Sequence, residues 1–230
     1  MIKQQKVLGI IPARGGSKTL PRKNVKVLAG KPLIAWTIEE ARKSKYIDRL
    51  IVSSDDAEII QVAKEWGGEV PFVRPAALAG DETPGIEPVI HALNTIGEKY
   101  DYMILLQPTS PLRTVADIDG CIHYCIRKDA PVCVSVSAAD ESPYWMYTLS
   151  EQRKMYPLMP AAKLIDRRQN LPPVYVLNGA VYVAQTDYLL KTKSFISEET
   201  VAYIMPGDRS WDIDDEMDFL ICDLIKAAGQ

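Results

Sequence analysis

The sequence predicts an α/β fold of the Rossmann-like, doubly wound type with a mostly parallel central sheet. Short apolar runs that suit buried strands alternate with longer segments whose apolar residues recur at helical spacing. Strand and helix follow each other in this order over residues 6–136, an arrangement that sets parallel strands side by side with helices on both faces. We predict a single domain over residues 1–230.

Each predicted element has its own local signal. KVLGII (6–11) and YMILL (102–106) suit strands that are buried on both faces. Pro32 fits the first turn of a helix, and Asp55 or Asp56 can cap the next one. The predicted strands are 6–11, 49–52, 70–73, 102–106, 132–136, 179–183 and 201–205, and the predicted helices are 32–44, 56–66, 84–99, 116–128 and 214–227.

Residues 140–175 interrupt this alternation. They contain several prolines and short mixed segments, so we expect either an excursion that packs on a partner subunit or irregular surface. The motifs described below each follow a predicted strand. Because ligands of open parallel sheets bind beyond the carboxyl ends of the strands, we expect these motifs to meet at one rim.

Composition narrows the class of protein. A net charge of -3 lacks the basic surplus of most nucleic-acid binders, so we expect no nucleic-acid partner. No stretch reaches the roughly 18 apolar residues of a membrane span, and the apolar run at the N-terminus is too short for a signal peptide. The 4 cysteines form no C-x-x-C pair and suit buried thiols in a reducing compartment. We therefore expect a cytoplasmic protein with no membrane contact.

A basic, glycine-containing loop follows the first strand and reads IPARGGSKTLPRKN. It combines cations, a pair of glycines that lets the backbone approach a ligand, and the Ser17 hydroxyl, which together suit a triphosphate. It is neither a Walker loop nor a dinucleotide fingerprint. The loop cations are Arg14, Lys18, Arg22 and Lys23.

Two carboxylates near the C-terminus have the spacing of a metal site. In the extended run SWDIDD, residues two apart face the same side, so Asp212 and Asp214 can share one cation while Ile213 points into the core. Mg²⁺ commonly takes one or two carboxylates together with substrate phosphates. The alternative is that these residues only begin the last helix, where Asp is a common cap, and this applies most to Asp215.

The run I-P-A-R-x-G-S-K-x-x-x-x-K-N, followed by G-x-P-L-I, resembles the signature of the acylneuraminate cytidylyltransferases. These are the synthetases of CMP-sialic acid and of its legionaminic and pseudaminic acid counterparts. The resemblance covers about residues 6–225 and implies a nucleotide-diphospho-sugar transferase fold and a homodimer joined through residues 140–175. It implies nucleotide contacts by Arg14, Gly16, Ser17, Lys18, Lys23 and Asn24.

Two further segments resemble the family. RPAALAGDET implies that Arg74 and Thr83 help to hold CTP; the alternative for Arg74 is a surface position paired with an acid such as Asp81. LLQPTSPLR implies that Gln107 lies between the nucleotide and the sugar. The remaining polar residues of that segment suit a turn and a helix cap instead, and they are Thr109, Ser110 and Arg113.

The stretch RQNLPPVYVLNGAVYV resembles the sugar-binding part of the family. The resemblance implies that Asn178 and Tyr182 face the acyl sugar and that Phe195 packs near it, although Tyr182 alone would also suit a half-buried strand position. Arg168 is a candidate for the sugar carboxylate, which a guanidinium binds bidentately. Some sialic acid members carry an Arg where this chain has Val176, so the identity of the acid stays open.

These observations predict a Mg²⁺-dependent transferase that couples CMP from CTP to a nonulosonic acid. Arg14, Lys18 and Lys23 would neutralise phosphate charge, and Asp212 would accept the proton of the attacking hydroxyl. A KDO cytidylyltransferase usually has an S-T-R-L-P-G-K motif, and a sugar-1-phosphate nucleotidyltransferase has a loop richer in glycine. An inactive nucleotide-binding module is the alternative from a different class.

Overall fold

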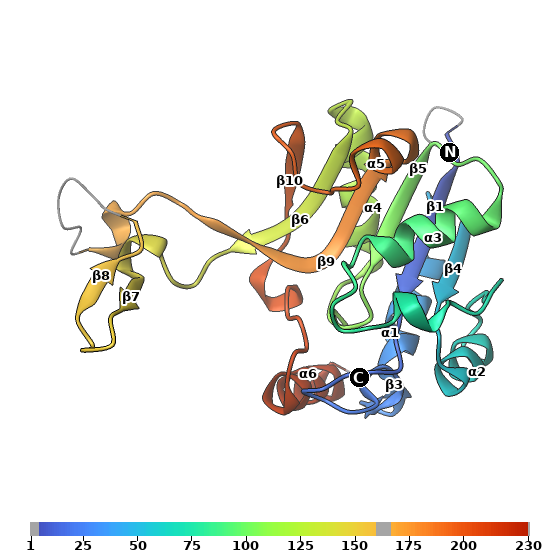
Figure 1. The fold of residues 1–230 in the computed structure, drawn as a ribbon, viewed down its shortest axis with the longest axis horizontal. Helices are drawn as coiled ribbons and strands as arrows, with labels where there is room; N and C mark the ends of the chain where they lie inside the picture. The colour runs from blue at the N-terminus through green and yellow to red at the C-terminus, as the bar shows by residue number, and fades with distance from the viewer. Residues whose placement is uncertain (1–4, 160–166, 230) are drawn as a thin grey trace.

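The computed structural model describes residues 5–159 and 167–229, which form a mixed six-stranded sheet with helices on both faces (Figure 1). In spatial order the strands are β10 (Thr200–Ile204), β6 (Val132–Ala138), β9 (Tyr175–Gln185), β5 (Tyr102–Leu106), β1 (Val7–Pro12) and β4 (Arg49–Ser53). Within this sheet β9 runs antiparallel to both of its neighbours, and the other paired strands run parallel. The predicted Rossmann-like, mostly parallel sheet is confirmed.

Apolar side chains on both faces of the central strands explain the layered arrangement. In β1, Val7 and Ile11 join one core cluster, whereas Leu8 and Ile10 join the cluster on the opposite face. The helices are α1 (Leu33–Arg42), α2 (Ala57–Glu65), α3 (Glu87–Ile96), α4 (Val115–Arg127), α5 (Thr186–Thr192) and α6 (Glu216–Ala228). The first cluster is covered by α1, α2 and α4, and the second by α3 and α5. In the described ranges, none of the helices has the length and apolar character needed to cross a bilayer.

A third, smaller hydrophobic core lies next to the ends of the central strands. There α6 packs against a two-stranded ribbon of β2 (Val27–Leu28) and β3 (Lys31–Pro32) and against the start of α1. Ile213, in the segment that leads into α6, is fully buried in this core. The C-terminal helix is thereby held beside the loop that follows β1.

Two predictions about the elements need correction. The predicted strand 70–73 is not a regular strand: Val73 and the preceding Glu69 form isolated bridges to β4 and its end, and Pro71 between them supplies no N–H for a ladder. The predicted strand 179–183 is longer, at Tyr175–Gln185, and it leads into α5, which the sequence analysis did not predict. Asp56 caps α2 as expected, since its side chain accepts from the backbone of Glu58 and Ile59.

Residues 139–174, here called the arm, leave the sheet after β6 and return at β9. The arm carries a hairpin of β7 (Tyr147–Leu149) and β8 (Met155–Pro157) that stands well away from the sheet (Figure 1). The interruption predicted at 140–175 therefore corresponds to a projecting segment. Residues 160–166 of it lie outside the described part of the chain.

Candidate functional site

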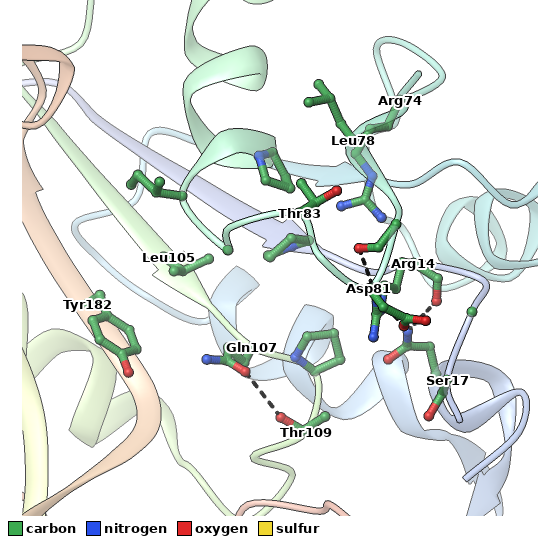
Figure 2. A pocket seen from close by; sticks show the side chains of 18 of the residues that line it. Arg14, Ser17, Arg74, Leu78, Asp81, Thr83, Leu105, Gln107, Thr109 and Tyr182 are labelled. Carbon is green, nitrogen blue, oxygen red and sulfur yellow. Dashed lines mark hydrogen bonds and ion pairs between the residues drawn. The ribbon is translucent and has the colours of Figure 1, made fainter. Parts of the chain in front are cut away.

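A pocket of about 870 Å³ opens at the rim formed by the ends of β1 and β5 and by β9. Because β9 is antiparallel, its first residues lie at the same rim as the last residues of β5. Figure 2 shows Arg14, Arg74 and Thr83 toward one end, Tyr182 toward the other, and Gln107 between them. The predicted site residues that line the pocket are Arg14, Gly16, Ser17, Lys18, Lys23, Asn24, Arg74, Thr83, Gln107, Tyr182, Phe195 and Asp214.

The loop after β1 is fixed by close packing rather than by regular structure. A Cβ on Gly15 would lie 2.6 Å from Asp56 Oδ2, so this glycine allows the loop to lie against the start of α2. Gly16 faces open space. Asn24 is buried and donates to the backbone oxygen of Arg14 at 3.0 Å, which holds the loop closed.

Not every loop cation reaches the pocket. Arg14 Nη1 and Lys18 Nζ both pair with the Asp81 carboxylate, at 3.0 and 2.7 Å. Arg14 also donates to the Gly80 oxygen, so the segment after Arg74 is tied to the loop (Figure 2). Arg22, which the sequence analysis grouped with these cations, turns instead to Asp56 and Glu58.

The carboxylate segment before α6 is bonded directly to the basic loop. Lys23 Nζ donates to the Ile213 oxygen at 2.6 Å, and Thr19 Oγ1 donates to the Asp214 oxygen at 2.6 Å. The Ile213 amide donates to the backbone oxygen of Thr109, so the carboxylate segment is also bonded to the segment after β5. Asp214 lines the pocket, and the expected inward direction of Ile213 is confirmed. The basic loop and the carboxylate segment, about 190 residues apart in the chain, thus form one wall of the pocket.

Asp212 lies behind Gly179, beside Gln107. A Cβ on residue 179 would lie 3.2 Å from Asp212 Oδ2 and 3.5 Å from Gln107 Nε2. Burial raises the pKa of the Asp212 carboxyl, a hydrogen bond from Thr109 opposes this shift, and the nearby Asp214 charge adds to it.

The two carboxylates suit a divalent cation in chemistry; Asp214 lines the pocket, whereas Asp212 lies outside its lining. Oδ1 of Asp212 is buried and has no hydrogen-bond partner among the described residues. A cation shared with Asp214 would satisfy this oxygen and offset the repulsion between the two acids. The described residues contain no group of three or more His, Cys, Asp or Glu side chains placed to hold a metal. Two carboxylates leave coordination positions that oxygen atoms of a bound ligand or of water would fill.

Arg74 and Gln107 are held by neighbours that the sequence did not reveal. Arg74 is buried and pairs with Asp55 at 3.0 Å, not with Asp81. The Gln107 carbonyl accepts from Arg113, a fully buried guanidinium that also donates to the Ala180 oxygen. Burial lowers the pKa of Arg113 to about 10. The structural role expected for Arg113 agrees with these bonds.

The opposite end of the pocket is mainly apolar. Tyr182 and Phe195 pack with their ring centroids 5.2 Å apart. Unforeseen lining residues here include Leu177, Lys193 and Ile196. Burial raises the pKa of the Tyr182 hydroxyl, so this group stays protonated and can donate a hydrogen bond.

Two residues expected to contact the sugar lie outside this pocket. Arg168 is on the arm, exposed, and donates to the Asp140 oxygen at 2.7 Å. Asn178 is buried and bonded to other protein groups, with 5% of its surface exposed. Within this chain, Arg168 and Asn178 therefore do not join Tyr182 and Phe195 at the apolar end.

Comparison with known proteins gives relatives of the full chain. A CMP-N,N'-diacetyllegionaminic acid synthase from Legionella pneumophila is 36% identical over 98% of both chains. A pseudaminic acid cytidylyltransferase from Campylobacter jejuni is 32% identical over 93% of both. An N-acylneuraminate cytidylyltransferase from Escherichia coli is 35% identical, and there the match covers 93% of this chain but 50% of the longer protein.

Solved structures share the fold at low sequence identity. A CMP:2-keto-3-deoxy-manno-octonic acid synthetase complexed with CTP superposes with a TM-score of 0.75 at 17% identity, covering 98% of this chain and 100% of the other. A 4-diphosphocytidyl-2C-methyl-D-erythritol synthase from Anaerococcus prevotii gives 0.67 at 12% identity, covering 96% and 98%. Residues 8–156 match the family model described as cytidylyltransferase. Given this match and its full-length relatives, the chain belongs to the cytidylyltransferase family.

Proposed function

We propose that this protein couples CMP from CTP to the anomeric hydroxyl of a nonulosonic acid and releases pyrophosphate. The observation that carries this proposal is that one pocket is lined by Arg14, Lys18, Lys23 and Asp214 at one part and by Tyr182 and Phe195 at another. The full-length relatives named for legionaminic and pseudaminic acid support the same class of acceptor.

The lining residues suggest where each part of the substrates binds. The triphosphate would lie against Arg14, Lys18 and Lys23, with the backbone of Gly16 and the Ser17 hydroxyl as donors. Arg74 and Thr83 would contact the rest of the nucleotide, since both line the same end. The acid sugar would lie against Tyr182 and Phe195. The Gln107 amide would then be at the junction of the two substrates.

The reaction that fits this arrangement is an in-line displacement at the α-phosphorus of CTP. The sugar oxygen forms a new bond to this phosphorus while the bond to the bridging oxygen of pyrophosphate breaks. The proton of the hydroxyl goes to Asp212, directly or through water. Lys18 and Lys23 neutralise charge on the departing phosphates, and the pocket holds both reactants in line.

The Asp212 and Asp214 carboxylates would hold Mg²⁺ together with phosphate oxygens of the nucleotide. When bound, the ion would supply charge neutralisation at the phosphates. The buried, unpartnered Oδ1 of Asp212 supports this assignment.

The proposed location is the cytoplasm, because the cysteines are unpaired thiols.

A homodimer joined through the arm is part of the proposal. The arm exposes a dense group of large apolar side chains, which usually marks an interaction surface. If a second copy of the chain covers these side chains, Arg168 on the arm would lie at the sugar end of that copy's pocket and bind the carboxylate there. The exposed large apolar residues of the described hairpin region are Trp145, Met146, Tyr147, Leu149, Met155, Tyr156, Leu158 and Met159.

The test is to incubate the protein with CTP, Mg²⁺ and a panel of acids, and to measure pyrophosphate and the CMP-sugar product. The panel contains N-acetylneuraminic, N,N'-diacetyllegionaminic, pseudaminic and KDO acids. Product with any nonulosonic acid is the expected result. Product with KDO alone would identify a KDO cytidylyltransferase. If the protein binds CTP but releases no pyrophosphate with any acid of the panel, it is an inactive nucleotide-binding module.

A further inference from the structure

Among the described residues, five cationic side chains line the pocket, and four of them already have partners in the protein. Arg14 and Lys18 share one carboxylate. Arg74 pairs with another acid, and Lys23 donates to a backbone oxygen. The fifth cation is Lys193, whose ammonium has no ion pair and no hydrogen-bond acceptor within the described ranges. Lys193 is also exposed, so a ligand can reach it.

Lys193 belongs to the apolar end of the pocket. It comes two residues before Phe195, whose ring packs with Tyr182 at a centroid distance of 5.2 Å. The acids that line the pocket in the described part of the chain are Asp81 and Asp214, and both are bonded to the basic loop instead. An ammonium beside apolar surface is screened less than one in open water, so it attracts an anion more strongly.

The loop after α5 holds Lys193 in a fixed position. The hydroxyl of Ser194 donates to the Ile196 oxygen at 2.8 Å and accepts from the Ile196 amide at 3.1 Å. Thr200 Oγ1 donates to the Phe195 oxygen at 3.1 Å. The backbone of Lys193 has a φ of +52°, which residues with a Cβ adopt at a cost. Strained positions that neighbours hold in place are frequent at ligand sites.

We infer that Lys193 binds the carboxylate of the acceptor acid, from the same chain whose basic loop holds the nucleotide. The inference deepens the proposed function and rests on it, because that function brings an acid to this end of the pocket. The carboxylate is the anionic group of such a sugar, and it is what an unpaired ammonium binds best. A carboxylate has about four acceptor positions, which leaves room for Arg168 of the partner subunit as well.

The kinetic experiment compares Lys193→Met with Lys191→Met, using CTP and the acid of the panel that the wild type converts fastest. Lys191 is exposed on α5, two residues away, and does not line the pocket, so the control removes the same charge. Loss of a charged hydrogen bond should raise KM for the acid by about 10-fold in Lys193→Met, with kcat and KM for CTP within about twofold. Lys193→Arg keeps the charge and should stay within about threefold of the wild type.

The methyl ester of the same acid identifies the group that Lys193 binds. Its Ki as a competitive inhibitor should be about equal for the wild type and Lys193→Met, because the ester carries no anion for Lys193 to bind. An ester Ki that rises as much as KM for the acid would overturn the inference, since Lys193 would then bind another part of the sugar. Equal rises of KM in Lys193→Met and Lys191→Met would overturn it too.

A calorimetric titration of the acid with CMP present needs no turnover. The Kd for the acid should be about 10-fold higher for Lys193→Met than for the wild type. An unchanged Kd would overturn the inference even if the wild type formed no product. Absence of product from a wild type that binds the acid would instead refute the proposed function.

Discussion

The Asp212 carboxylate lies so close to the backbone of Gly179 that a Cβ on residue 179 would crowd it. Gly179 has a φ of +70°, and a Cβ there would lie 3.2 Å from Asp212 Oδ2. This close approach joins the antiparallel strand of the sheet to the segment before α6. It therefore couples the backbone geometry of β9 to the position of the proposed proton acceptor.

Gly179→Ala should lower both stability and kcat. The left-handed backbone should cost about 1–2 kcal/mol of unfolding free energy in any residue with a Cβ. The matched control is Gly97→Ala at φ +69°, where a Cβ would meet nothing within 4 Å. Urea unfolding should show a similar loss for both variants, whereas CMP-sugar formation should fall only for Gly179→Ala. Equal kinetics in the two variants would contradict a role for this close approach.

Asp81→Asn should lower KM for CTP. Asp81 neutralises Arg14 and Lys18, and a triphosphate bound to these cations must replace its carboxylate. Exposed ion pairs are weak, so we expect KM for CTP to fall by about two- to fivefold with little change in kcat. Glu82→Asn removes the same charge from the neighbouring position as a control. A marked rise in KM for CTP in Asp81→Asn would show that Asp81 orients the cations for binding instead.

Asp56 should contribute stability that is lost in acid. A hydrogen bond from Arg22 holds the pKa of the Asp56 carboxyl below its ordinary value near 3.8, assisted by the backbone of Ile59. Asp55 and Glu58 are the acids nearest to it in the chain. Because the folded pKa is depressed, the stabilisation is complete above the unfolded pKa and disappears as the pH falls through the folded value.

The measurement for Asp56 is urea unfolding of the wild type and Asp56→Asn across the acid range. Asn can still cap α2, so the comparison isolates the charge. We expect the wild type to be more stable by about 1 kcal/mol near neutral pH, with the difference shrinking below about pH 4. A difference that stays constant into strong acid would argue against this ion pair.

Leu149→Glu on the arm should convert the proposed dimer to a monomer. Leu149 is 64% exposed in one copy, and burying a charge at an apolar interface is costly. Leu224→Glu on α6, where the side chain is 61% exposed, introduces the same charge away from the arm. Sedimentation velocity should give a monomer for Leu149→Glu and a dimer for the wild type and the control. A dimeric Leu149→Glu would place the contact elsewhere.

Several features that depend on local sequence were predicted correctly, whereas pairings between distant side chains were not. The loop after β1 and the inward turn of Ile213 follow from charge, glycine and alternation within a few residues. The pairing of Asp81 with Arg14 and Lys18 joins residues more than 60 positions apart, and no periodicity signals it. The arm could be anticipated because its prolines and mixed segments break the alternation of strands and helices.

The different directions of Asn178 and Tyr182 have a physical origin that a sequence pattern does not reveal. In a regular strand, residues 178 and 182 would lie on the same face. Here the pairing between β6 and β9 shifts opposite Val134 and Val136, and Gly179 takes a positive φ. Asn178 consequently contacts Met205 on one side of the sheet, while Tyr182 packs with the core on the other.

The central claim is that the basic loop and the carboxylate segment act in one cleft on a single phosphoryl transfer. Steady-state formation of the CMP-sugar by Asp212→Asn and Asp215→Asn tests it most directly, because the two variants remove the same charge three residues apart. Asp215 caps α6, and Asn can replace it there. Loss of a proton acceptor should lower kcat by at least about 100-fold in Asp212→Asn, while Asp215→Asn stays near the wild type. Near-normal turnover by Asp212→Asn would contradict the account.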